Sequence, residues 1–155
     1  MNLHIGRSFD ELRLGDEFTT SSTLTEAHIV LGAGLFGDFN PLHVDQSFAA
    51  ASRFEGRIAH GYLTSNVMAA PLGMLFHGTA IAYVEHLIRF LHPVRAGDTL
   101  QVRWTVAALD AKPRHGGGLV TLEGRCVNQD GIEVASAEAK MLAYDRAHCQ
   151  QAATQ

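Results

Sequence analysis

The second half of the chain alternates apolar and polar positions with the period of a β-strand. In residues 100–106 and 135–143, every second side chain is apolar or small, and those between them are mostly polar. Residues 79–92 form one long apolar run, and residues 120–128 alternate more weakly. The turns between these segments are short and rich in glycine: residues 96–98, 116–118 and 130–131. Because short turns join antiparallel neighbours, we predict four long antiparallel strands after residue 78.

The first half of the chain predicts one strand followed by helices. Residues 17–24 are rich in threonine and serine, which favours a strand. Thr25 is a suitable N-cap for a helix over residues 26–31, and the glycines that follow weaken any continuation of that helix. Residues 47–52 predict a short helix rich in alanine.

Residues 61–76 are apolar in nearly every direction of a helical wheel, so we expect a helix enclosed by the rest of the protein. Pro71 and Gly73 should kink this helix or end it early. Together these elements predict an α+β fold, in which a curved antiparallel sheet wraps around one long central helix. One helix covers only part of such a sheet, so dimerisation along its edge or across its open face is expected.

Length and composition limit the possible classes of protein. The 155 residues fit a single domain, predicted over residues 1–145, with residues 146–155 as a flexible tail. A hydrophobic content of 46% excludes disorder, and a net charge of −4 without a basic run argues against a nucleic-acid partner. No apolar run approaches the ~20 residues of a membrane-spanning helix, so no membrane partner is expected. Two cysteines form no disulfide framework, which points to a reducing cytoplasm.

Candidate chemistry is concentrated between Asp38 and Gly61. Asp38 and His43 flank Asn40-Pro41, and this dipeptide disfavours a regular helix and predicts a rigid, bent loop. A carboxylate and an imidazole on such a loop are suited to moving protons on a bound molecule. The glycine that opens the long apolar segment offers a backbone N–H that can approach a substrate oxygen without a Cβ in the way.

Two other interpretations of this loop were weighed. Taken alone, Asp-x-Asn-Pro would more simply be a turn in which Asp38 caps backbone N–H groups and His43 is solvated. The alternation of Asp38, Asn40, His43 and Asp45 resembles a calcium loop, but Pro41 and the missing distal glutamate break that pattern. No metal site is therefore predicted.

Polar residues elsewhere carry weaker signals. Ser65 and Asn66 lie on the apolar helix, where each could line a pocket or bond within the core with equal probability. His86 shares a strand face with Val84 and Ile88 and is interpreted as a core histidine. An anionic ligand would have to meet a local group of arginines: Arg53, Arg57, Arg89 and Arg95. Arg89 and Arg95 are the candidates for contacts with phosphate groups of such a ligand, although lone arginines near turns are usually solvated.

The central stretch closely resembles the hydratase motif of the MaoC-like family, which includes the (R)-specific enoyl-CoA hydratases. The residues that carry the resemblance are Gly37-Asp38-Phe39-Asn40-Pro41-Leu42-His43-Val44-Asp45, Phe48-Ala49-Ala50 and Ile58-Ala59-His60-Gly61. Similarity extends outward to cover most of residues 8–144. One departure is Phe36, where many members carry serine or threonine before the motif glycine, and this bears on pocket shape.

The resemblance implies a hot-dog fold that works as a homodimer, possibly within a higher oligomer, on acyl thioesters of coenzyme A. The implied reaction adds water to a trans-2-enoyl-CoA to give an (R)-3-hydroxyacyl-CoA, or runs in reverse. Asp38 and His43 would form the catalytic pair, without assignment of which is acid and which is base, and the Gly61 N–H would hold the thioester carbonyl. Supporting positions are Asn40, Pro41, Asp45 and His60, with Asn40 orienting the pair through its amide. Coenzyme A is part of the substrate, and no other cofactor is implied.

Two competing functions remain open at this point. A hot-dog thioesterase would need a carboxylate on or near the buried helix, and residues 61–76 contain neither Asp nor Glu. A non-catalytic module that binds acyl thioesters would not need both Asp38 and His43.

Overall fold

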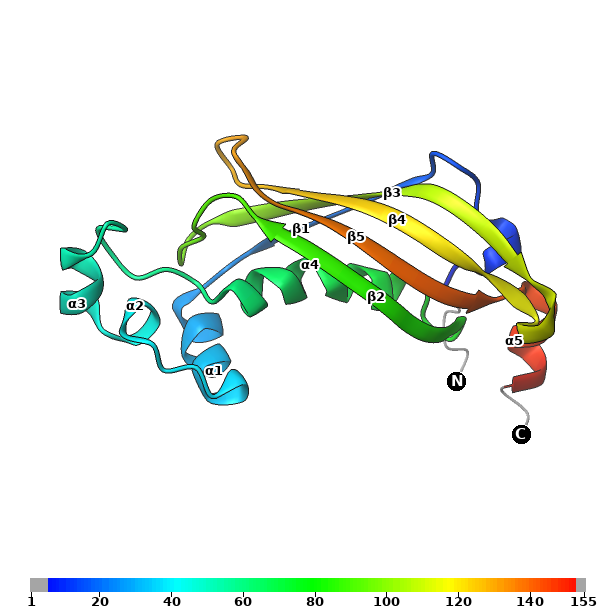
Figure 1. The fold of residues 1–155 in the computed structure, drawn as a ribbon, viewed down its shortest axis with the longest axis horizontal. Coiled ribbons are helices and arrows are strands. Elements are labelled where there is room, and N and C mark those ends of the chain that lie inside the picture. The colour runs from blue at the N-terminus through cyan, green and yellow to red at the C-terminus, as the bar shows by residue number, and fades with distance from the viewer. Residues whose placement is uncertain (1–5, 153–155) are drawn as a thin grey trace.

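The computed structural model describes residues 6–152 and contains one five-stranded antiparallel sheet with the strand order β1-β3-β4-β5-β2. The curved sheet lies over the long helix α4, and three shorter helices extend beyond one end of the sheet (Figure 1). The strands are β1 (Glu17–Thr23), β2 (Ala80–Phe90), β3 (Thr99–Lys112), β4 (Gly117–Val127) and β5 (Glu133–Tyr144). The helices are η1 (Phe9–Glu11), α1 (Glu26–Phe36), α2 (Pro41–Val44), α3 (Gln46–Ala51), α4 (Gly61–Leu75), η2 (Pro113–His115) and α5 (Arg146–Ala152). This arrangement confirms the predicted α+β class.

Helix α4 packs against the sheet through one row of side chains. Thr64, Met68 and Leu72 are buried at a spacing of one helical turn, and Trp104 of β3 donates its indole N–H to the Met68 carbonyl at 2.9 Å. The alanines on the inner face of β5 allow this close approach: Ala135, Ala137, Ala139 and Ala143.

Two predictions about α4 need correction. The helix runs through Pro71 to Leu75, because packing of Leu72 and Phe76 in the core outweighs the one backbone donor that proline lacks. It is also not enclosed on all sides, since Tyr62 and Met74 are exposed. None of the helices in residues 6–152 combines the length and apolar character needed to cross a membrane.

The predicted strand face of Val84, His86 and Ile88 is interrupted in β2, which lies at the edge of the sheet. The register shifts between Tyr83 and Glu85, and Val84 is exposed instead of sharing a buried face with His86. The Tyr83 hydroxyl and the His86 Nδ1 are hydrogen-bonded at 2.6 Å, and the His86 ring lies 6.3 Å from the Trp104 ring. His86 is thus half-buried, and this burial lowers the pKa of its imidazole.

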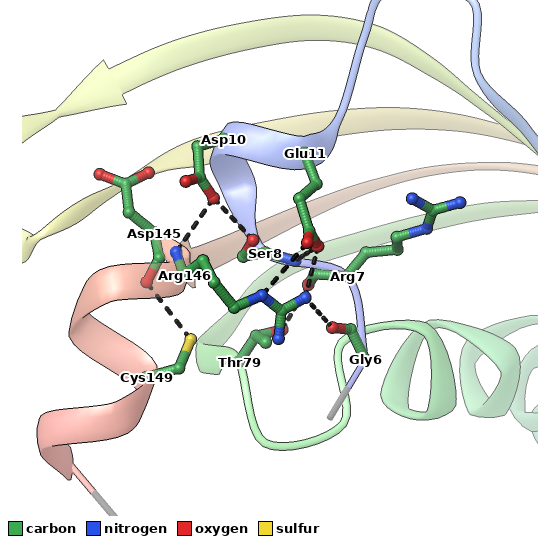
Figure 2. Close-up of polar contacts among 9 residues, drawn as sticks. All are labelled: Gly6, Arg7, Ser8, Asp10, Glu11, Thr79, Asp145, Arg146 and Cys149. Carbon is green, nitrogen blue, oxygen red and sulfur yellow. Dashed lines mark hydrogen bonds and ion pairs between the residues drawn. The ribbon is translucent and has the colours of Figure 1, made fainter. Parts of the chain in front are cut away.

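Residues 146–152, predicted to belong to a flexible tail, form helix α5, whereas residues 153–155 lie outside the described residues. Arg146 docks this helix onto η1: its guanidinium donates to the Glu11 carboxylate and its backbone N–H donates to Asp10 Oδ1 at 3.0 Å (Figure 2). The same guanidinium donates to the Gly6 carbonyl at 2.8 Å. A charge-assisted network between the two ends of the described chain therefore holds α5 in place.

This network should make stability depend on pH through Glu11. Its hydrogen bond from Arg146 lowers the pKa of the Glu11 carboxyl to about 2, from an ordinary value of 4.5. A lowered pKa stabilises the fold above the unfolded value, and that contribution is lost as the pH falls from about 4.5 towards about 2. We expect Glu11→Gln to lower the free energy of unfolding by about 0.5–1 kcal/mol at pH 7, because the pair is partly exposed.

The measurement is urea denaturation at pH 7 and at pH 3. The difference between Glu11→Gln and wild type should shrink at the lower pH. Glu17→Gln is the matched control, because the carboxylate of Glu17 makes only an exposed ion pair, at 3.8 Å from Arg103. Equal losses in the two variants would contradict the docking role of Glu11.

Candidate active site

The structure brings the carboxylate of Asp38 and the imidazole of His43 together at one end of the sheet. Helix α1 ends at Gly37, whose left-handed conformation (φ 69°) turns the chain towards Asp38. Asn40 has extended backbone angles and accepts the Leu42 N–H at 3.0 Å, so it is the N-cap of α2. The single turn of α2 then carries His43 to 3.8 Å from Asp38, measured from Nε2 to Oδ2.

The prediction that Asn40-Pro41 excludes helix needs a correction. Pro41 is the first residue of α2, where its missing N–H would have no helical partner in any case. The side chain of Asn40 is used as a cap instead of orienting the pair through its amide; its backbone N–H donates to Asp38 Oδ1 at 3.1 Å. Asp45 caps α3 by accepting the Phe48 N–H at 2.9 Å, which agrees with its predicted role in holding the loop.

Hydrogen bonding determines which nitrogen of His43 faces Asp38 with a lone pair. The Nδ1 atom lies 2.8 Å from the Ile58 carbonyl oxygen, which can only accept, so Nδ1 carries the proton in the neutral ring. Nε2 is therefore free to accept a proton on the side of Asp38. The 3.8 Å separation is too long for a direct hydrogen bond, but both groups can bind the same water.

His60 contacts both Asp38 and His43. It is 1% exposed, and its Nε2–H donates to the Asp38 carbonyl oxygen at 2.9 Å. Its ring packs on the His43 ring with the centroids 3.9 Å apart, and the Phe36 ring packs edge-on against it with the centroids 5.7 Å apart. Its buried Nδ1 has no partner among the described residues. His60 thus holds both the backbone of Asp38 and the ring plane of His43.

Asp38, His43 and His60 each offer one possible metal-ligand atom, and these atoms lie within 4.8 Å of one another. The nitrogen of His60 nearest this loop is committed as a donor to a backbone carbonyl, and the proton on His43 Nδ1 is committed to another. A metal bound through His60 Nε2 would have to break the first of these bonds. The donor set is better suited to proton transfer than to metal coordination.

A cavity of about 340 Å³ extends from His43 to the start of α4, and neither Asp38 nor His60 is among its lining residues. It is lined by residues from the loop, the helix and the chain after β2: His43, Arg53, Phe54, Ile58, Ala59, Gly61, Thr64, Phe90, Leu91, His92, Pro93 and Val94. Gly61 is the first residue of α4, so its N–H has no partner within the helix. The helix dipole adds partial positive charge at this end of the cavity.

Not every predicted residue belongs to this cavity. Asn66 lines a separate cavity of about 380 Å³ between β1 and α4, and Ser65 is half-buried and lines neither cavity. Thr64 was not predicted, yet it is buried one turn from Gly61 with its side chain at the cavity wall. Its spacing from Gly61 was the available signal, because residues one turn apart share a helix face.

Replacing Gly61 with alanine should lower turnover while leaving the fold intact. The added Cβ would lie 3.1 Å from the end of the Phe90 ring, which can move by the small amount required. The methyl group would also crowd any oxygen that approaches the backbone N–H, so we expect kcat to fall by about tenfold or more. Steady-state kinetics and the melting temperature measure the two effects.

Gly73→Ala is the matched control in the same helix, because its added Cβ meets no atom within 4 Å. It should leave kcat unchanged. A Gly61→Ala variant with wild-type kcat would show that the first turn of α4 does not contact the reacting group.

The model of the MaoC like domain matches residues 12–122. The chain belongs to the MaoC-like family. An (R)-specific enoyl-CoA hydratase of Aeromonas caviae is 33% identical over 133 residues, which cover 85% of this chain and 96% of that protein. An (R)-specific enoyl-CoA hydratase of Rhodospirillum rubrum is 38% identical over 101 residues, or 65% of this chain and 70% of the relative.

Solved structures of the family agree with the architecture described above. An unliganded R-hydratase from Pseudomonas aeruginosa superposes with a TM-score of 0.79 at 32% identity, covering 90% of this chain and 86% of the other. This MaoC-like chain therefore has the hot-dog fold that the resemblance implied.

Proposed function

We propose that this protein catalyses the reversible hydration of trans-2-enoyl-CoA to (R)-3-hydroxyacyl-CoA. The observation that carries the proposal is the 3.8 Å separation between Asp38 and His43, together with the cavity that His43 and Gly61 both line. The gap is suited to one water hydrogen-bonded to both side chains. Family membership supports the same reaction, since relatives with this activity are similar over most of the chain.

The proposed reaction starts with the thioester carbonyl accepting the Gly61 N–H, which draws electron density away from C3 of the enoyl group. The Asp38–His43 pair removes one proton from the bound water, and the resulting hydroxide adds to C3. The negative charge that develops on the carbonyl oxygen is stabilised at the N-terminus of α4. The proton taken from water is then delivered to C2, so the net change is addition of one water. The reaction needs no cofactor beyond the coenzyme A part of the substrate.

Crotonyl-CoA tests this proposal against its two competitors. Loss of the enoyl absorbance without release of free thiol supports hydration. Release of thiol supports a thioesterase, and neither change supports a module that only binds thioesters. Treatment with a metal chelator should leave the hydration rate unchanged.

We infer that the working unit is a homodimer. β2 forms one edge of the sheet, and large apolar side chains remain exposed on the helices and on the loop between α1 and α2, at the end where the cavity lies. They include Leu35 of α1 at 81% exposure, Phe39 at 65% and Tyr62 of α4 at 74%. A second copy of the chain would cover such a surface. Light scattering should give about twice the chain mass of 16.8 kDa, and a monomer at micromolar concentration would contradict this inference.

A further inference from the structure

We propose that Arg53 binds a phosphate group of coenzyme A and thereby selects substrates that carry the nucleotide part of this carrier. The inference rests on the proposed function, since it concerns the same cavity. Arg53 lines the cavity that contains His43 and Gly61, and it is itself exposed. A residue that is both exposed and part of the lining lies where the cavity opens to solvent. A thioester carbonyl at Gly61 would place the rest of its carrier along this cavity, towards that opening.

The other arginines that the sequence suggested for an anion are committed elsewhere. Arg57 donates to Glu26 at 2.7 Å, and Arg95 donates to the Phe54 carbonyl. Arg89 lines a hollow shared with Arg125, which lies on the face of the sheet opposite the buried side chains. None of these three guanidinium groups is available at the cavity mouth.

Arg53 differs from Arg57 in having no counter-charge, and from Arg89 and Arg95 in lining the cavity that contains His43 and Gly61. Among residues 6–152, the recorded ion pairs and side-chain hydrogen bonds leave the Arg53 guanidinium without a partner. The central guanidinium carbon of Arg53 lies over the ring of the neighbouring Phe54, 4.8 Å from the ring centroid. Stacking on an aromatic face restricts the guanidinium without using its N–H donors. These donors can therefore form the paired hydrogen bonds that arginine makes with phosphate.

The segment that carries Arg53 is held firmly, although it is a loop. The Ser52 hydroxyl donates to the Ala49 carbonyl at 2.7 Å and accepts the Phe54 N–H at 3.1 Å. Glu55 has a left-handed backbone with φ 56°, which is unusual for a residue other than glycine. Gly56 then returns the chain through a bond from its N–H to the Ala49 carbonyl at 3.0 Å. A strained, fully bonded turn of this kind fixes where its side chains start, so Arg53 is positioned before a ligand arrives.

The test compares two thioesters that share the reacting group. Crotonyl-CoA carries the phosphates, and the N-acetylcysteamine thioester of crotonic acid lacks them. We expect Arg53→Gln to raise KM for crotonyl-CoA roughly three- to tenfold with little change in kcat, as for a partly exposed charged pair. The same variant should hydrate the N-acetylcysteamine thioester as the wild type does. Arg103→Gln, on the outer face of β3, removes the same charge and should change neither value.

Equal KM values for wild type and Arg53→Gln with crotonyl-CoA would overturn the proposal, as would equal losses with both thioesters. Calorimetric titration with free coenzyme A provides a readout that does not depend on turnover. The Kd should rise by a similar factor in Arg53→Gln and stay unchanged in Arg103→Gln. If the wild type hydrates neither thioester but shows this change in Kd, the proposed hydratase function fails while the phosphate site stands. An unchanged Kd would overturn the site whatever the activity.

Discussion

Asp38→Asn will lower kcat for hydration of crotonyl-CoA by roughly 10²–10⁴-fold. The substitution keeps the size of the side chain, and its amide oxygen can still accept the Asn40 N–H that now binds Asp38 Oδ1 at 3.1 Å. It removes the negative charge and the ability to exchange a proton with a water that would bridge Asp38 and His43, whose side chains lie 3.8 Å apart. The loss should therefore appear mainly in kcat, with the melting temperature close to that of the wild type.

His43→Gln should give a loss of similar size, since it removes the Nε2 lone pair that faces Asp38. The double variant should be little less active than either single variant, because two residues that act on the same water lose their combined effect when either one is replaced. His77→Gln, at an exposed histidine, is the matched control and should retain full activity. Near wild-type turnover in either single variant would defeat the assignment of the pair.

Gly117→Ala will produce the largest loss of stability that the described structure suggests for so small a change. An added Cβ would lie 1.9 Å from the Ala143 carbonyl oxygen and 2.8 Å from the Tyr144 Cα. Both are backbone atoms of the neighbouring strand β5, so neither can rotate away as a side chain would. The strands must separate, and we expect the free energy of unfolding to fall by about 2–3 kcal/mol.

Urea denaturation measures this loss, and Gly34→Ala is its control. Gly34 lies in the interior of α1, where an added Cβ meets no atom within 4 Å. Alanine there should raise the free energy of unfolding by about 0.5–1 kcal/mol through helix propensity. Similar changes in the free energy of unfolding from the two substitutions would show that the contact with β5 does not cause the loss of stability in Gly117→Ala.

The strands were predictable where one face of the sheet is buried throughout. In β5 the small side chains lie inward at every second position, so the sequence pattern and the burial agree. In β2 the shift after Tyr83 depends on pairing with β5 and leaves no mark on the local pattern. Helix α1 was predicted too short for a related reason: Gly32 is a poor helix former, but an added Cβ there would lie 3.1 Å from the Phe36 ring, so the lack of a Cβ suits this packing.

The same distinction applies to the site. Asp38 and His43 are brought together by short-range caps and turns, whose residues can be read from the local sequence. The wall of the cavity comes from Phe90 and the residues after it, which are distant in sequence from the loop. Arg53 could therefore be assigned to the cavity only from the structure, whereas the one-turn spacing of Thr64 from Gly61 was a signal in the sequence.

The most direct test of the central claim is the stereochemistry of hydration in ²H₂O. Since Asp38 and His43 lie 3.8 Å apart on one loop and are proposed to act on one water, the hydroxyl and the deuterium should reach the same face of the double bond. NMR analysis of the product from crotonyl-CoA should show the (R) configuration at C3, with the deuterium at C2 added syn to the hydroxyl. Addition of the two groups to opposite faces, or an (S) product, would contradict the account.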